Sequence, residues 1–193
     1  MSWNEYTYIL DSGLIITKPV IYVPEKILKV CKKLAKRFVY YEFSILVKGK
    51  WTERGFELSE EYAIPRQEVT SYNVKYNNKH VAELIAKGFN TVIHKHPDGM
   101  TRFSPTDEDF INANFTASIL FTDDEFVKAI INISFKKGWK LQVDAEIKVK
   151  EKDEIEVKDI ENIKPKPEVD ISLGEQSINF RGWEYGFSFG DEK

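Results

Sequence analysis

Two histidines separated by one residue, His94 and His96, are the side chains of this sequence best suited to share a metal ion. They follow an apolar stretch typical of a β-strand, in which side chains alternate between two faces, so both imidazoles project to the same side. Asp107 offers an oxygen ligand at the start of an expected helix. Two histidines and one carboxylate leave a fourth position open for water, which is typical of catalytic rather than structural zinc sites.

Glu42 lies at the beginning of a second stretch that could serve this site, residues 40–51, which is rich in β-forming residues. Its central run, Ile45, Leu46 and Val47, is uninterrupted, as expected of a strand covered on both faces. A carboxylate that enters a buried strand is costly unless it is paired, exposed at the strand end, or used in chemistry. Glu42 is therefore a candidate functional residue.

The stretch after the histidines predicts the start of a helix. Ser104 suits the N-cap, Pro105 the first helical position, and Asp107 stands three residues after the cap. By themselves Ser104 and Asp107 are explained by helix capping, and a lone His-x-His pair can arise by chance. The combination is more specific than any of its parts.

Together these residues resemble the signature of the JAMM (MPN+, JAB domain) metalloproteases. The signature is an upstream Glu42, then His94-x-His96-Pro97, then Ser104-x-x-Asp107 beginning seven residues after Pro97. The similarity covers residues 1 to about 150. It implies a zinc-dependent peptidase or isopeptidase, typically one that cleaves ubiquitin-like modifiers after a C-terminal glycine. It also implies an α/β (α+β) fold in which a mixed, mostly antiparallel β-sheet is flanked by helices.

The resemblance assigns a role to each signature residue. His94, His96 and Asp107 would hold Zn²⁺, which lowers the pKa of a bound water to about 7 in favourable sites. Glu42 would take the proton of this water and pass it to the departing amine. Ser104 would donate a hydrogen bond to the developing oxyanion.

The chain departs from the common family pattern at two positions. Ile45 stands where many eukaryotic members have glycine, and Lys95 replaces a small hydroxyl residue between the histidines, whereas Gly49 stands where a glycine is usual. By strand alternation, Lys95 points away from the histidines, so we expect it to tune substrate charge or stability. His80 has no carboxylate or cysteine at ligand spacing and is not expected to bind metal.

Hydrophobic periodicity and turn residues predict the remaining elements. Residues 7–16 are expected to be extended, with a turn at 11–13. A helix that begins at Pro24 should bury Ile27, Val30, Cys31, Leu34 and Phe38. Further elements are expected at these places: two strands within 55–76, a helix over 78–87 capped by Asn78, and strands over 117–121, 126–135 and 140–149.

The predicted organisation has three parts. Residues 1–150 form the metalloprotease domain, residues 151–170 a charged linker, and residues 171–193 an aromatic, β-rich C-terminal tail. The tail either packs back on the core as a hairpin or docks a partner. Residues 50–80 would occupy the insertion region with which the family often grips the modifier.

Composition narrows the partners and the compartment. The net charge of −3 provides no broad basic surface for phosphate neutralisation, which argues against nucleic acid as the main partner. One cysteine excludes an internal disulfide and fits a reducing compartment. The sequence shows neither a signal peptide nor a membrane span, so we expect a cytoplasmic protein. A peptide or ubiquitin-like protein is the expected substrate, and a homo-oligomer is compatible with the composition.

Two alternatives stay open at the level of sequence. One is a catalytically silent binding or scaffold protein of the same fold, against which the intact signature argues. The other is a phage-tail or defence-system peptidase that uses the same chemistry on cell-wall or protein substrates.

Overall fold

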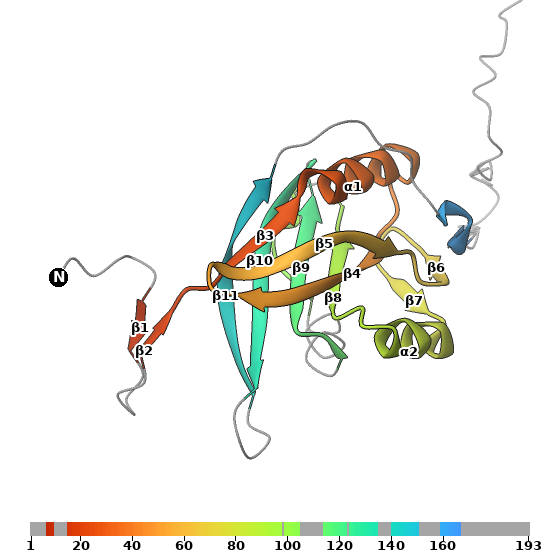
Figure 1. Ribbon diagram of the computed structural model, residues 1–193. Coiled ribbons are helices and arrows are strands. Elements are labelled where there is room, and N and C mark those ends of the chain that lie inside the picture. The colour runs from red at the N-terminus through yellow and green to blue at the C-terminus, as the bar shows by residue number, and fades with distance from the viewer. Residues whose placement is uncertain are drawn as a thin grey trace, which may run out of the picture.

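A closed barrel of seven strands forms the main body of the computed structural model, which describes residues 7–9, 15–97, 99–104, 114–122, 124–134, 140–150 and 159–166 (Figure 1). Each strand pairs with two neighbours around the ring. In order around the barrel the strands are β10 (Glu125–Ser134), β11 (Lys140–Lys150), β3 (Val20–Pro24), β5 (Gly55–Ala63), β4 (Phe43–Thr52), β8 (Thr91–Lys95) and β9 (Ala117–Thr122).

The closure corrects the expected architecture. The mixed α/β composition is confirmed, and four of the seven strand pairings are antiparallel, against three parallel. The sheet, however, is not an open layer flanked by helices. It closes because β3, a strand that the sequence pattern did not predict, pairs in parallel with β11 on one side and with β5 on the other.

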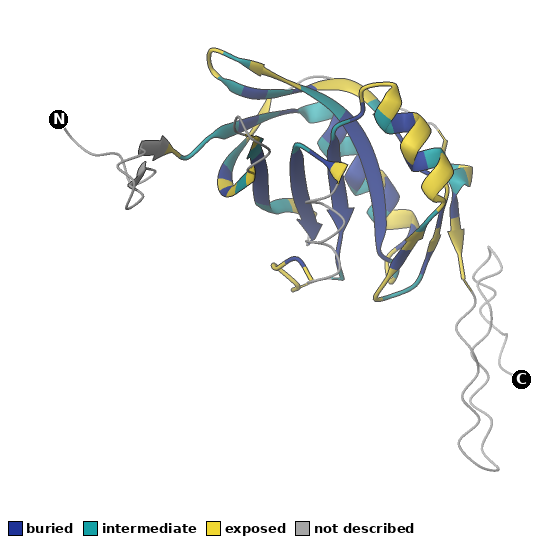
Figure 2. Cartoon of the chain, turned by 90° about the horizontal axis from the view of Figure 1, so that it is seen from below, coloured by how far each residue is buried: buried dark blue, intermediate teal, exposed yellow. Residues whose placement is uncertain are grey.

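Helix α1 (Glu25–Arg37) lies along β3, β5, β10 and β11. Its apolar residues recur at helical spacing, and the face they form is fully buried, whereas the opposite face is exposed (Figure 2). Burial raises the pKa of the Cys31 thiol, which is consistent with the expected packing role of this residue. The expected helix and its buried residues are confirmed: Ile27, Val30, Cys31, Leu34 and Phe38.

Helix α2 (Asn78–Ala86) is capped one residue earlier than expected. The side chain of Asn77, rather than that of Asn78, accepts a hydrogen bond from the His80 backbone N–H at 3.0 Å. Beyond the helix, Gly88 adopts φ of 92°, a left-handed conformation that favours glycine at a helix end. The buried residues Val81 and Leu84 join a hydrophobic cluster separate from that of α1.

Strand β4 is covered on both faces, which explains its uninterrupted apolar run. Ile45 and Val47 pack in the cluster that contains α1, whereas Leu46 packs in the cluster that contains α2. Strand β8 divides in the same way, with Ile93 on the α1 side and Val92 on the α2 side. Alternation therefore assigns every second residue of these strands to the α2 side of the sheet.

A small three-stranded sheet stands beside the barrel. Its order is β12 (Ile163–Pro165), β6 (Gln67–Val69) and β7 (Val74–Tyr76), and a 3₁₀ helix, η1 (Ile160–Asn162), precedes β12. Residues 55–76 thus form three strands rather than the expected pair, and β5 ends before Pro65, as expected. Part of the stretch predicted to be a linker, residues 160–165, belongs to η1 and β12.

The other predicted strands, β8 to β11, lie where the patterns placed them, as does the hairpin of β1 (Thr7–Ile9) and β2 (Ile15–Thr17). Several predicted features lie outside the described residues: the turn at 11–13, the helix after Ser104 and the tail 171–193. The domain boundaries stay a prediction.

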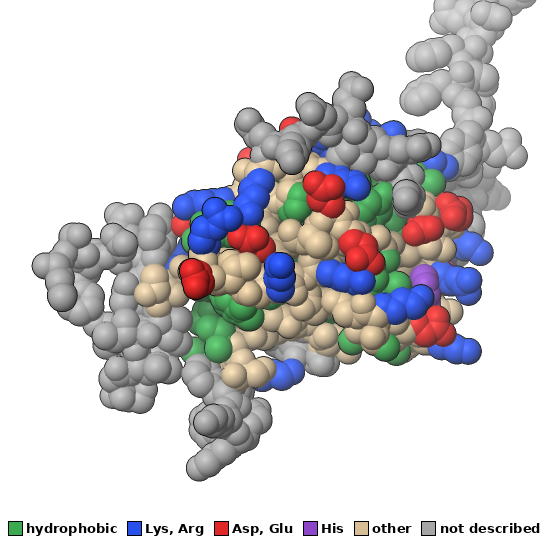
Figure 3. Space-filling view, viewed as in Figure 1, with side chains coloured by type: hydrophobic (Ala, Val, Ile, Leu, Met, Phe, Trp, Pro, Cys, Tyr) green, Lys and Arg blue, Asp and Glu red, His purple; other side chains and the backbone are tan. Residues whose placement is uncertain are grey.

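On the face shown in Figure 3, Lys and Arg side chains are interspersed with Asp and Glu. Examples of neighbouring opposite charges are the ion pairs of Lys48 with Glu61 at 2.8 Å and of Lys29 with Glu25 at 3.1 Å. Within the part of the chain that the structure describes, no helix combines the length and the apolar character needed to cross a membrane.

Candidate metal centre

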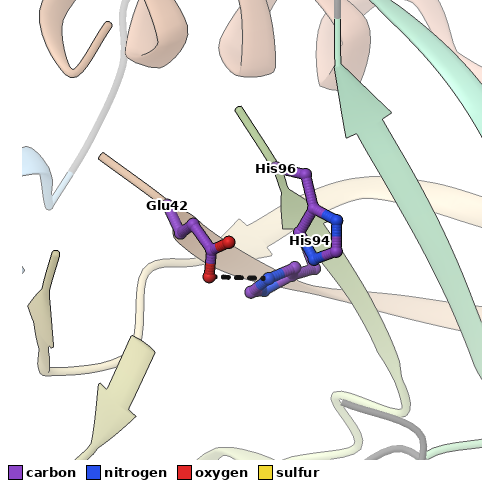
Figure 4. Close-up of side chains that lie close together, drawn as sticks. All are labelled: Glu42, His94 and His96. Atoms are coloured by element: carbon purple, nitrogen blue, oxygen red, sulfur yellow. Dashed lines mark ion pairs between the residues drawn. The ribbon is translucent and has the colours of Figure 1, made fainter. Parts of the chain in front are cut away.

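Glu42, His94 and His96 converge at one end of the β4–β8 pair (Figure 4). Glu42 immediately precedes β4, His94 belongs to β8, and His96 lies one residue beyond the end of β8. The antiparallel register places Ser44 opposite His94. Because Glu42 stands two residues before Ser44 and His96 two residues after His94, the three side chains share one face and one end of the sheet.

The distances are those of side chains that can share one ion. One potential ligand atom from each of the three residues lies within 4.8 Å of the others. Glu42 Oε2 lies 3.4 Å from His94 Nε2. The two imidazole rings are nearly perpendicular, with centroids 4.7 Å apart and an interplanar angle of 84°.

All three side chains are buried: Glu42 is 6% exposed, His94 3% and His96 2%. A buried carboxylate is costly unless a positive charge compensates it. The positive charge can come from a protonated histidine or from a bound cation. Two imidazole nitrogens and a carboxylate oxygen form a donor set that suits Zn²⁺ and other divalent transition metals, so the residues present fit a metal ion.

The chain segments that carry these residues are fixed by backbone hydrogen bonds beyond the strand ends. The Glu42 N–H donates to the Thr70 carbonyl oxygen at 2.8 Å, and the His96 N–H donates to the Phe121 carbonyl oxygen at 3.0 Å. The Thr122 hydroxyl donates to the Pro97 carbonyl oxygen at 3.0 Å. The residue after β6 and the end of β9 therefore hold the two sides of the cluster in place.

Ser44 connects His94 to the small sheet. Its hydroxyl oxygen lies 2.8 Å from His94 Nδ1 and 2.7 Å from the Tyr76 hydroxyl oxygen. Its backbone is held by the Gln67 side chain, whose Oε1 accepts from the Ser44 N–H at 2.9 Å and whose Nε2 donates to the Ser44 carbonyl oxygen at 2.8 Å. The sequence did not predict a role for Ser44, Gln67 or Tyr76. Only Ser44 could have been suspected, because strand alternation places it on the same face as Glu42.

A serine, a histidine and a glutamate in hydrogen-bond or ion-pair contact also have the chemical order of a nucleophilic triad. The burial of Ser44 argues against this reading, since the side chain has 0% exposed surface and its oxygen already contacts Tyr76. A nucleophile must reach its substrate. Ser44 is therefore better understood as a neighbour of the metal centre.

Two residues of the sequence signature are not placed in the cluster by the structure. Ser104 is described and exposed, at the end of the segment 99–104. Asp107, the expected third ligand, lies outside the described residues. Their assigned roles, like those of Glu42, His94 and His96, stay predictions.

Lys95 and His80 have structural contacts. Lys95 is 2% exposed and its Nζ donates to the Val39 carbonyl oxygen at 2.7 Å, just beyond the C-terminus of α1. The expectation that Lys95 faces away from the histidines agrees with this contact, and the expectation that it tunes substrate charge or stability stays a prediction. His80 Nδ1 accepts a hydrogen bond from the Arg66 N–H at 2.9 Å, away from the cluster.

A polar cavity of about 750 Å³ lies against the small sheet. Gln67 and Tyr76 line it, together with charged residues of β6, β7 and the segment around η1 and β12. The lining does not include Glu42, His94 or His96. The cavity therefore adjoins the residues that support the cluster rather than the cluster itself.

A comparison with solved structures finds similarity to one described as "JAMM: A Metalloprotease-like Zinc Site in the Proteasome and Signalosome". The match has 16% sequence identity, covers 66% of this chain and 97% of the other, and has a TM-score of 0.37, which by itself establishes neither fold nor function. No protein-family model matches the chain, and no curated protein matches it. The case for a metal site therefore rests on Glu42, His94 and His96.

Proposed function

We propose that this protein is a zinc-dependent metallopeptidase of the JAMM type. One observation carries the proposal: a glutamate and a His-x-His pair from distant stretches of the chain meet in a buried cluster that can hold a divalent metal. These three residues belong to the signature found in the sequence, which supports the proposal.

In this proposal His94, His96 and Asp107 hold the zinc ion. Asp107 is included on the strength of the signature spacing alone. When bound, zinc lowers the pKa of a water ligand to about 7 and so supplies a nucleophile near neutral pH.

Glu42 acts as the general base. Its carboxylate lies beside the ligand nitrogens, 3.4 Å from His94 Nε2, where it can accept the proton released as water attacks the scissile carbonyl. It then delivers this proton to the nitrogen that leaves when the carbon–nitrogen bond breaks. Ser104 donates a hydrogen bond to the carbonyl oxygen as negative charge develops on it.

The same distance also allows Glu42 to be a ligand. Glu42 Oε2 and His94 Nε2, 3.4 Å apart, are close enough for both atoms to bind one ion, and a carboxylate oxygen is an ordinary zinc ligand. The two assignments make different predictions for metal binding. A base can be neutralised without loss of metal, whereas a ligand cannot.

Metal analysis of purified variants tests the proposal. We expect about one zinc per chain in the wild type, because three protein ligands and one water complete a catalytic site. His94→Ala and Asp107→Asn should lose the metal. Glu42→Gln should keep it and lose hydrolysis. His80→Ala is the matched control, because His80 lies outside the cluster and should keep both metal and activity.

The outcomes separate the assignments. If Glu42→Gln loses zinc while Asp107→Asn keeps it, Glu42 is the third ligand and Asp107 is not. If Glu42→Gln remains fully active, the general-base assignment is wrong. Zinc-free protein that still hydrolyses substrate overturns the mechanism.

The proposed substrate is a peptide or isopeptide bond of a ubiquitin-like modifier, and the proposed compartment is the cytoplasm. Zinc-loaded wild type should be incubated in parallel with ubiquitin-like conjugates and with cell-wall peptides, with Glu42→Gln as the inactive control. Cleavage of the conjugates supports the proposal. Cleavage of cell-wall peptides alone indicates the phage-tail or defence-type alternative, and a zinc-loaded protein that cleaves neither indicates a binding protein.

A further inference from the structure

We propose that Ser44 and Tyr76 are positioning residues that hold His94 in the tautomer able to bind metal. The inference rests on the proposed function, since it concerns a ligand of the proposed zinc ion. The two ring nitrogens of His94 face different neighbours. Nδ1 lies 2.8 Å from Ser44 Oγ, and Nε2 lies 3.4 Å from Glu42 Oε2.

Neutral imidazole carries one proton, on either Nδ1 or Nε2, and the nitrogen without the proton is the one that can bind metal. The Nε2 atom faces the cluster, so metal binding there requires the proton on Nδ1. Nδ1–H must then donate to an acceptor. Ser44 Oγ, at 2.8 Å, is that acceptor.

The serine hydroxyl has one proton and two lone pairs. If its oxygen accepts from His94 Nδ1, its own proton is available for the Tyr76 oxygen, which lies 2.7 Å away. The hydrogen bonds then run in one direction, from His94 to Ser44 to Tyr76. The reverse direction would place the His94 proton on Nε2, facing Glu42, and would oppose metal binding.

The position of Ser44 is itself fixed. Gln67 holds both the N–H and the carbonyl oxygen of Ser44, and β4 pairs Ser44 with His94 across the strands. The hydroxyl therefore has little freedom to leave His94. A partner that orients a metal-binding histidine typically contributes 10- to 100-fold in metal affinity.

The test measures zinc affinity by competition with a chromophoric chelator. We expect Ser44→Ala to weaken zinc binding about 10- to 100-fold, and Tyr76→Phe, which removes only the second hydroxyl, to weaken it less. Ser44→Thr keeps a hydroxyl and should retain most of the affinity. Ser118→Ala is the matched control: Ser118 is also a fully buried strand serine, but its oxygen has no hydrogen-bond partner among the described residues.

A second readout reports the tautomer directly. Long-range ¹H–¹⁵N correlation spectra of the zinc-loaded wild type should show His94 with its proton on Nδ1, and metal-free Ser44→Ala should have a larger Nε2-protonated fraction than the metal-free wild type. The inference is overturned if Ser44→Ala binds zinc like the wild type or if its tautomer is unchanged. A wild type that binds no zinc instead overturns the proposed function, and this inference with it.

Discussion

Strand β4 is held at two points by a side-chain amide that takes the place of a neighbouring strand. Where the pairing with β5 stops, Gln67 makes two hydrogen bonds to the backbone of Ser44. Where the pairing with β8 stops, Asn90 does the same for Gly49, accepting from its N–H at 2.8 Å and donating to its carbonyl oxygen at 2.9 Å.

The two points differ in what the held residue does. Ser44 has a side chain, and that side chain contacts His94 of the candidate metal centre. Gly49 has none, and the aromatic ring of Phe56 occupies the space where a Cβ atom would lie. The same backbone support therefore serves a candidate site at one point of the strand and only packing at the other. Three variants test this distinction, and a fourth tests the role of Lys95.

The largest effect is expected for Gln67→Leu. Loss of the amide leaves the buried N–H and carbonyl oxygen of Ser44 without this partner, which should lower the free energy of unfolding by about 2–4 kcal/mol. Zinc affinity should fall as well, because Ser44 loses its fixed position beside His94. Urea denaturation and chelator competition measure the two quantities. A destabilised variant with unchanged zinc affinity would show that Ser44 does not depend on Gln67.

Gly49→Ala should affect stability alone. The added Cβ would lie 2.4 Å from Phe56 Cε1 and 2.9 Å from Leu58 Cδ2, so the ring must move. Overpacking of this kind typically costs about 1–3 kcal/mol. The double variant Gly49→Ala/Phe56→Leu should recover part of this loss in the same urea measurement. If the double variant is no more stable than the sum of the two single effects predicts, the clash is not with Phe56.

Asn90→Leu removes the two hydrogen bonds to Gly49 and should lower the free energy of unfolding by less than Gln67→Leu does. Asn90 is only partly buried, so water can replace some of the lost hydrogen bonds to Gly49, and we expect a loss of about 1–2 kcal/mol. Zinc affinity should equal that of the wild type. A clear loss of zinc affinity in Asn90→Leu would show that Asn90, like Gln67, supports the candidate metal centre.

The smallest effect is expected for Lys95→Met, on the opposite face of β8 from the histidines. The variant removes the hydrogen bond to the Val39 carbonyl oxygen but fills the same space with an apolar side chain, and loss of one such bond should lower the free energy of unfolding by about 1 kcal/mol. Val39 is 46% exposed, and its carbonyl can be hydrated. Zinc content and the rate of hydrolysis should be unchanged if Lys95 serves stability alone, and a changed rate would show that Lys95 tunes substrate charge.

Local patterns predicted the elements that carry the site. The apolar run of β4, the strand before His94 and the helical spacing of α1 each have a period that identifies the element and its buried face. The same period placed His94 and His96 on one face, and the structure brings Glu42 to them. These features depend only on short stretches of the chain, so they could be predicted from the sequence.

What could not be predicted depends on pairing between distant stretches. Nothing near Gln67 or Tyr76 indicates contact with Ser44, because the contact arises only when the small sheet packs beside β4. Closure of the barrel could not be predicted either, because it depends on β3, a short apolar stretch whose pairing with the distant strands β5 and β11 leaves no local pattern. Asp107 and the tail lie beyond the described residues, so their predictions stand untested.

The pairing of β3 with β11 also has a consequence for the order of events during synthesis. Residues 20–24 cannot complete their place in the barrel until residues 146–150 have emerged from the ribosome. Until then one side of β3 is an unpaired edge, the kind of surface on which nascent chains aggregate. The strands that carry Glu42, Ser44, His94 and His96 are all made earlier. Glu42, His94 and His96 are therefore all synthesised before the strand that closes the barrel.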